Sequence, residues 1–161
     1  MKIGFNEAND RFCKDHSVMK DLEYCEKYGF DFIDIQSECL NRDLEAGKIT
    51  LEEMGEWFKT HHLKMLSYNA LCFFNMKQTQ EEKDAVMAEL DEIIRRCDIL
   101  GCKMIVVVPS KDMKERGLTP TRKEIREDAV AVLKEMVKKC EPHGIKLSLE
   151  FCGEPAMTIN R

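Results

Sequence analysis

The chain has 161 residues, a length that fits a single domain. Its 43% hydrophobic and 34% charged residues provide enough apolar side chains for a core and exclude a disordered chain. The formal net charge of −5 disfavours binding to nucleic acid or to an anionic membrane. A small neutral or cationic ligand is the partner that this charge favours.

Neither the N-terminus nor the longest apolar run indicates a membrane or export segment. Residues 1–7 lack the apolar run of a signal peptide, and residues 104–109 are too few to cross a bilayer. We therefore expect a cytoplasmic protein. The eight cysteines stand singly, without a Cys-x-x-Cys pair and mostly in apolar surroundings, which predicts reduced thiols in the core.

Short β-like runs alternate with longer helical patterns along the chain. In chain order, the pattern predicts a strand at 3–6, a helix at 17–28, a strand at 30–36, a helix at 50–61, a strand at 63–69, a helix at 79–101, a strand at 104–108, a helix at 119–143 and a strand at 145–151. Thr50 and Thr79 are each followed three residues later by glutamate, the spacing of a capping box. Thr119 and Pro120 are expected to begin the last helix.

Repeated strand, helix and strand define the α/β class with a parallel sheet. Residues 104–108 are continuous and β-branched, as in a strand buried on both faces. One possible architecture is a five-stranded doubly wound sheet of flavodoxin type. The other is an incomplete (β/α)8 TIM barrel, of which this chain supplies about the first five strands and four helices. At about 36 residues per unit the complete barrel would need about 280 residues.

Ligands of parallel α/β folds bind at the carboxyl ends of the strands, where polar residues are therefore candidates for function. Asn6, Glu7 and Asn69 fall at such ends and are candidates to hydrogen-bond substrate hydroxyl groups, with a structural loop contact as the alternative for each. Glu150 ends the last predicted strand. A carboxylate there needs a divalent metal or a neighbouring Lys or Arg, and its position alone leaves both open.

The four histidines are expected to serve structure instead of metal binding. His16, His61, His62 and His143 all lie at predicted helix starts or ends. A histidine near a helix C-terminus more often interacts favourably with the helix dipole than with a metal ion.

Several segments together resemble inosose isomerases of the sugar phosphate isomerase/epimerase group, which have a xylose isomerase-like barrel. They are residues 5–8 (Phe-Asn-Glu-Ala), 21–31, 60–62 (Thr-His-His), 69–71, 73–75, 141–144 (Glu-Pro-His-Gly), 149–153 (Leu-Glu-Phe-Cys-Gly), Pro155 and 158–160. The similarity covers nearly the whole chain and favours the barrel over the five-stranded sheet.

The resemblance implies a metal-dependent enzyme that isomerises a keto-inositol or similar keto-sugar through an enediolate. One divalent metal ion (Zn, Mn, Co or Mg) would be held by Glu, Asp, His and Glu near the ends of the later strands. Glu150 matches the first ligand by its position and its Leu-Glu-Phe context, and would also act as one of the two catalytic acid–base groups. The other three ligands would come from later strands.

These inferences predict that residues 1–161 are the N-terminal portion of a single barrel domain and are inactive alone. An exposed strand edge would offer a surface for homo-oligomer formation. The alternative is a non-catalytic five-stranded binding or assembly module. An apurinic endonuclease on a related barrel is disfavoured, because the chain is acidic and lacks a clustered basic face.

Overall fold

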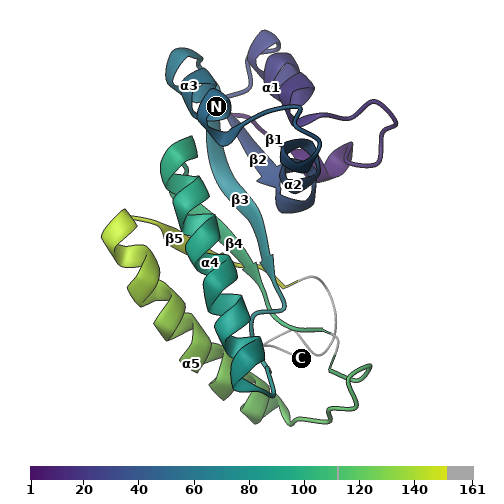
Figure 1. Ribbon diagram of the computed structural model, residues 1–161, viewed down its shortest axis with the longest axis vertical. Helices are drawn as coiled ribbons and strands as arrows, with labels where there is room; N and C mark the ends of the chain where they lie inside the picture. Colours follow the sequence, from purple (N-terminus) through teal and green to yellow (C-terminus); the bar gives the residue numbers. More distant parts are fainter. Residues whose placement is uncertain (112, 152–161) are drawn as a thin grey trace. The chain divides into compact units, whose positions relative to one another are not determined.

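The structure is a computed structural model, which describes residues 1–111 and 113–151 (Figure 1). The strands are β1 (Gly4–Asn6), β2 (Phe32–Gln36), β3 (Lys64–Cys72), β4 (Met104–Val108) and β5 (Lys146–Leu149). The helices are α1 (Val18–Lys27), α2 (Ser37–Glu45), α3 (Leu51–Thr60), α4 (Gln80–Leu100) and α5 (Arg122–Cys140), with short 3₁₀ helices η1 (Glu7–Asn9) and η2 (Glu141–His143).

The strands follow one another in the sheet in the order β1-β2-β3-β4-β5, and β2 pairs in parallel with both β1 and β3. Sequential order is the order of a (β/α) barrel. A flavodoxin-like sheet would have the order 2-1-3-4-5. The five predicted strands are therefore confirmed, and the doubly wound alternative is wrong.

The expectation of four helices is wrong, because the described residues form a fifth helix, α2. This helix begins directly after β2, and Gln36 at its N-cap makes no side-chain capping hydrogen bond. It therefore lacks the Thr and Glu spacing that marks the starts of α3, α4 and α5. Its buried face, formed by Cys39, Leu40 and Asp43, includes a carboxylate, which weakens the apolar pattern further.

The first residue of α5 also differs from the prediction. Thr121, and not Thr119, is the N-cap: its side chain accepts a hydrogen bond from the Glu124 amide, and Glu124 binds the Thr121 amide in return. The reciprocal bonds of a capping box outweigh the preference of proline for the first helical turn. The two capping boxes predicted at Thr50 and Thr79 are confirmed.

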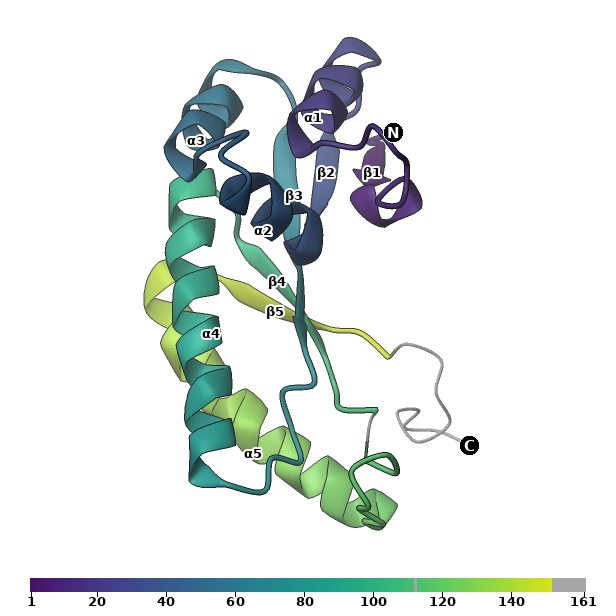
Figure 2. The same cartoon turned by 45° about the vertical axis from the view of Figure 1, so that its right-hand side comes forward.

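Two compact units make up the chain, and each is described by itself. Unit 1 comprises Met1–Asn69 and Arg95–Met104, and unit 2 comprises Ala70–Ile94 and Ile105–Arg161. In unit 1, helices α1, α2 and α3 lie beside the first three strands (Figure 2). The predicted apolar face of α1 is buried, as are Ile33 and Ile35 of β2. Helix α3 approaches the last turn of α4 so closely that a Cβ on Gly55 would lie 2.7 Å from the Ile99 carbonyl oxygen.

Strand β3 contains one extra residue relative to β2. Ile33 is aligned with Met65, but the next residue, Asp34, is aligned with Ser67, so that Leu66 is left out of the register. The Ser67 hydroxyl donates a hydrogen bond of 2.6 Å to Asp34 Oδ1 just after this irregularity. The shift brings Gln36 and Asn69 into register at the carboxyl end of the strand pair.

Unit 2 has an apolar core on β4, in agreement with the prediction of a strand buried on both faces. Beyond the strand ends, two loops are joined by buried neutral groups: the Ser110 amide donates to Asn75 Oδ1 at 2.7 Å, and the Ser110 hydroxyl donates to the Asn75 carbonyl at 2.5 Å. We call this Asn75–Ser110 contact the neutral clasp. Helices α4 and α5 are joined by an ion pair in unit 2, with Lys139 Nζ of α5 lying 2.7 Å from Asp91 Oδ1 of α4.

The prediction of core thiols is confirmed for five of the seven cysteines that the structure describes and is wrong for Cys13 and Cys72. Cys25, Cys39, Cys97, Cys102 and Cys140 are buried, Cys13 and Cys72 are exposed, and all seven are free. Cys152 lies outside the described residues, as do the resembling residues from 152 onward. No helix in the described part of the chain is both long and apolar enough to span a membrane.

Candidate functional site

Three amide side chains lie at the carboxyl ends of β1 and β2 and within β3. The prediction that the third strand ends at Asn69 is wrong, because β3 continues to Cys72. Asn6 caps η1 by accepting a hydrogen bond of 2.9 Å from the Ala8 amide. The same Oδ1 atom of Asn6 accepts from Gln36 Nε2 at 3.3 Å, and Gln36 is aligned with Asn69 on β3. Asn6 and Asn69 are half-buried. Amides in this arrangement can donate and accept hydrogen bonds with a polyhydroxylated ligand.

Glu7 follows Asn6 and is fully buried. Its Oε2 accepts a hydrogen bond of 2.7 Å from the Gln36 backbone amide, which ties the end of β1 to the end of β2. Burial raises the pKa of the Glu7 carboxyl to about 8, and the nearby Asp21 and Asp10 add to the rise, while the bond from Gln36 opposes it. The carboxyl group of Glu7 is buried within unit 1. The substrate contact predicted for Glu7 stays a prediction.

His16 lies against Glu7, with only 1% of its side chain exposed. Its Nε2 atom is 2.9 Å from Asp21 Oδ2, 3.2 Å from Glu7 Oε1 and 3.6 Å from Asp10 Oδ1. On the other side of the ring, Arg42 Nη2 is 2.5 Å from Nδ1. A guanidinium can only donate, so Nδ1 is the acceptor and the neutral ring carries its proton on Nε2.

The assignment of His16 to a helix-dipole role is therefore wrong. The residue precedes the N-cap of α1, Ser17, and its imidazole is buried among carboxylates. Burial lowers the pKa of His16, and Arg42 lowers it further, against the attraction of Asp10. By contrast, His61 does lie at a helix end, as predicted: it is the C-cap of α3 and stacks on Trp57 with ring centroids 3.9 Å apart.

Two further aspartates complete this buried polar cluster. Burial raises the pKa of Asp21 to about 7, and the neighbouring Asp10 carboxyl raises it as well. Asp43 behaves oppositely: burial opposes its ionisation, but bonds from the Val18 amide, Lys48 and Arg42 hold its pKa below the usual value. We define the buried polar cluster as Glu7, Asp10, His16, Asp21, Cys39, Arg42 and Asp43.

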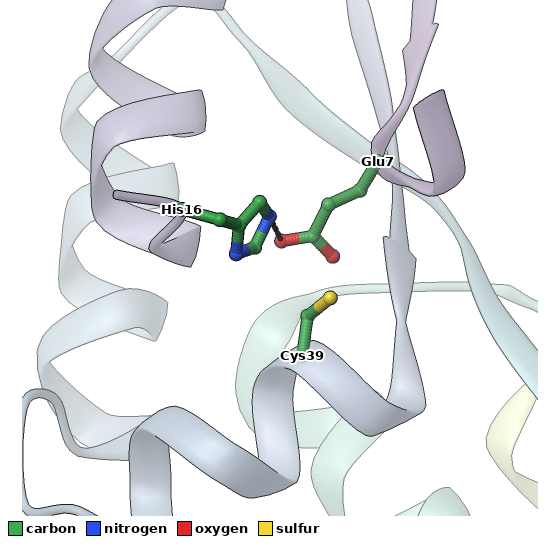
Figure 3. A group of neighbouring side chains, drawn as sticks. All are labelled: Glu7, His16 and Cys39. Carbon is green, nitrogen blue, oxygen red and sulfur yellow. Dashed lines mark ion pairs between the residues drawn. The ribbon is translucent and has the colours of Figure 1, made fainter. Parts of the chain in front are cut away.

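Of the residues in this cluster, only Glu7 was predicted from the sequence as a functional residue. Two sets of atoms in it lie close enough together to hold a metal ion: one from Glu7, His16 and Cys39, shown in Figure 3, and one from Asp10, His16 and Asp21. The available sequence indication was the density of titratable residues between positions 7 and 21. Cys39 gave no such indication, because it lies on the helix that the pattern did not predict.

Glu150 belongs to unit 2. It is exposed, it follows the last residue of β5, and its backbone amide donates a hydrogen bond of 3.0 Å to the Val107 carbonyl on β4. The structure thus places Glu150 at a strand end, as predicted, and brings Asn6 and Glu7 together around Gln36. A carboxylate in this position can serve as an oxygen ligand for a divalent cation or as a proton acceptor.

Sequential parallel strands with helical crossovers and polar side chains at their carboxyl ends define a barrel-type α/β protein. Residues 22–161 match the family model described as the xylose isomerase-like TIM barrel. The chain therefore belongs to that family, and the resemblance found in the sequence is confirmed at this level.

The chain is also similar to individual family members. It is 37% identical to the inosose isomerase of Bacillus licheniformis, with 99% of this chain and 55% of the relative covered, and 35% identical to that of Bacillus velezensis, with 99% and 54% covered. A crystal structure of the IolI protein with a bound zinc atom superposes with a TM-score of 0.85 at 35% identity, covering 99% of this chain and 55% of that one. The chain thus spans about half the length of the curated relatives it matches.

Proposed function

We propose that residues 1–161 are the N-terminal portion of a single xylose isomerase-like barrel, and that the whole protein is a cytoplasmic isomerase of an inosose or a closely related keto-sugar. The observation that carries the proposal is the 35–37% identity to inosose isomerases over 99% of the chain. The placement of Glu150 directly after β5 supports it, since active sites of barrel enzymes lie at this end of the strands.

The proposal includes one divalent metal ion, zinc, manganese, cobalt or magnesium, with Glu150 as a ligand. The exposed carboxylate of Glu150 suits such an ion, and the similar IolI structure contains zinc. One carboxylate does not make a metal site. The remaining Asp, His and Glu ligands implied by the resemblance would have to come from later strands.

Glu150 would also move the proton in the reaction. A bound divalent metal stabilises negative charge that develops on substrate oxygen atoms. Glu150 would accept a proton from the carbon next to the substrate carbonyl, and the enediolate formed would regain a proton at the neighbouring carbon from a second acid. In unit 1, the amides of Asn6 and Asn69 would hydrogen-bond hydroxyl groups of the substrate, and Glu7 would hold the Gln36 backbone beside the Asn6 amide.

The decisive experiment is to sequence the coding DNA after the Arg161 codon, to express the whole protein, and to measure isomerisation of a keto-inositol with each of the four metals. Glu150→Gln is expected to lower turnover roughly 10²- to 10⁴-fold, because the amide can neither accept the proton nor ligate the metal as a carboxylate does. Glu141→Gln, at an exposed glutamate of η2, is the matched control and should leave turnover unchanged.

The 161-residue chain alone is expected to show no turnover in the same assay, because it would supply one metal ligand of four. Activity of the whole protein that is unaffected by Glu150→Gln would contradict the proposed role of that residue. Strong activity of the 161-residue chain would contradict the proposal that it is a portion of the enzyme. We also propose that the outer edge of β5, which pairs only with β4 within the described residues, is a surface for association between copies of the chain.

A further inference from the structure

Three side chains of the buried polar cluster point toward one another from different segments of unit 1 (Figure 3). Glu7 comes from η1, His16 from the loop before α1, and Cys39 from α2. All three are buried, and a carboxylate oxygen of Glu7, a His16 ring nitrogen and Cys39 Sγ lie within 4.8 Å of one another. Carboxylate, imidazole and thiol are the three side-chain groups that bind zinc in proteins.

Two of these atoms lack a hydrogen bond in the part of the chain that the structure describes. Glu7 Oε1 and His16 Nε2 are both buried and 3.2 Å apart, but they do not meet in hydrogen-bonding geometry. A buried polar atom without a partner costs about 1–3 kcal/mol. His16 Nε2 also lies 2.9 Å from Asp21 Oδ2, which has no hydrogen bond in the described residues either, so several ligand atoms gather around one region that a bound cation would use.

The spacing of the two atoms fits a common metal ligand sphere. Ligands about 2.0–2.1 Å from a tetrahedral zinc ion lie about 3.3 Å from one another. The observed separation of Glu7 Oε1 and His16 Nε2 is 3.2 Å. Cys39 Sγ lies within 4.8 Å of a Glu7 oxygen and a His16 ring nitrogen, and a movement of its side chain would bring it to ligand distance.

The charge of the cluster also favours a divalent cation. Four carboxylates, those of Glu7, Asp10, Asp21 and Asp43, act on this region together with the two cations Arg42 and Lys48. When all are ionised, two negative charges remain in excess. Either two protons or one divalent ion would neutralise them.

We propose that Glu7 Oε1, His16 Nε2 and Cys39 Sγ form a zinc site in unit 1, distinct from the metal ion assigned to Glu150. The thiol donor selects zinc over magnesium or calcium, which prefer oxygen ligands alone. A water molecule fills the fourth position of the tetrahedron. On binding, the thiol proton of Cys39 and the carboxyl proton of Glu7 pass to the solvent, so that the ligands are thiolate and carboxylate.

Arg42 and the metal ion favour opposite tautomers of the His16 ring. Its bond to Nδ1 keeps the ring proton on Nε2, whereas zinc on Nε2 requires the proton to be on Nδ1. The Arg42 side chain is 43% exposed and is also held by Asp43 through Nε, so its Nη2 can turn away from the ring and keep that ion pair. Arg42→Gln is therefore expected to tighten zinc binding, because a glutamine oxygen can accept the Nδ1 proton.

Titration calorimetry of the 161-residue chain with Zn²⁺, in a competing chelator buffer, tests the proposal. The starting variant carries serine at Cys152 and at Cys13 and Cys72, the two exposed cysteines of the described residues, so that none of these three thiols binds the metal. We expect one zinc ion per chain, and Cys39→Ser should weaken binding at least about tenfold. Cys25→Ser, at an equally buried cysteine of α1, is the matched control and should leave binding unchanged.

Cobalt gives a readout that reports the ligands directly. Co²⁺ should produce a sulfur-to-metal charge-transfer band that disappears in Cys39→Ser and persists in Cys25→Ser and Glu150→Gln. Absence of stoichiometric zinc binding would overturn the proposal, as would binding that is lost in Asp21→Asn but unchanged in Cys39→Ser. Because Glu150→Gln should not affect this site, its outcome is separable from that of the proposed isomerase function.

Discussion

The two units hold their strand-end segments in place by different chemistry. In unit 1, Glu7 ties the ends of β1 and β2 together and lies within a cluster of ionisable groups. In unit 2, the neutral clasp between Asn75 and Ser110 joins the loops after β3 and β4. Both devices are buried, and both satisfy a backbone amide at the end of a strand or in the loop beyond it.

Because of this difference, the two contacts are expected to respond differently to pH. A neutral clasp contributes the same free energy at any moderate pH, because neither amide nor hydroxyl titrates there. A buried carboxyl whose pKa lies near 8 gains or loses a proton within the ordinary range, and its contribution to stability changes with it. The Glu7 contact of unit 1 is thus expected to be sensitive to protons and cations, and the neutral clasp of unit 2 to be indifferent to protons.

Breaking the neutral clasp is expected to have the largest effect. Asn75→Ala leaves the buried Ser110 amide without its acceptor, and the free energy of unfolding should fall by about 2–3 kcal/mol. Urea denaturation at pH 6.5 and pH 8.5 should show the same loss at both. Ser110→Ala, which removes only the hydroxyl bond, should cost less. A loss for Asn75→Ala that changes with pH would contradict the contrast between the units.

The next largest effect is the pH dependence of the parent chain, measured with a chelator present. The folded-state pKa of Glu7 lies near 8, above its ordinary value of 4.5, and that of Asp21 lies near 7. The folded state therefore binds more protons than the unfolded state, and stability is lost as the pH rises through these values. From pH 6.5 to 8 the free energy of unfolding should fall by about 2 kcal/mol.

His16 does not reverse this trend, since its pKa is lowered and the ring is largely neutral above pH 6.5 in both states. Glu7→Gln removes the titrating group and keeps a hydrogen-bond acceptor for the Gln36 amide. The slope of stability against pH should then become much flatter. An unchanged slope in this variant would show that Glu7 does not retain its proton in the folded chain.

The smallest predicted effect is the loss of the N-cap of α5, an exposed feature of unit 2. Thr121→Ala removes the N-cap of α5 and should cost about 1 kcal/mol. Thr119→Ala, two residues earlier, is the matched control and should have almost no effect, because Thr119 is not the cap. Equal losses in the two variants, measured by thermal unfolding, would contradict the capping box seen at Thr121.

Features that depend on neighbouring residues were predictable from the sequence. The strand at Met104–Val108 is marked by its β-branched run, and the starts of α3 and α4 by a threonine and a glutamate three residues apart. Helix α2 was missed because it begins without a side-chain cap and its buried face includes Asp43. Position at a strand end also identified Asn6, Asn69 and Glu150 as candidates.

The interior of the candidate site in unit 1 was not predictable, because it depends on contacts between distant segments. Glu7 is buried against His16, and the segment that carries His16 is bonded to Arg42 and Asp43 of a helix 25 to 26 residues later in the sequence. No local pattern encodes such a contact. The architecture, by contrast, was predicted from the sequence as either a doubly wound sheet or a (β/α)8 barrel. The observed strand order β1-β2-β3-β4-β5 is that of the barrel.

The extra residue Leu66 in β3 sets which side chains stand level with one another at the strand ends. If Leu66 were instead paired with Asp34, the register that begins at Phe32 and Lys64 would place Gln36 opposite Tyr68, and Asn69 would lie one residue, or about 3.3 Å, farther along. The alignment of Asn69 with Gln36 therefore depends on Leu66 staying outside the strand pairing. It should tolerate many side chains at position 66.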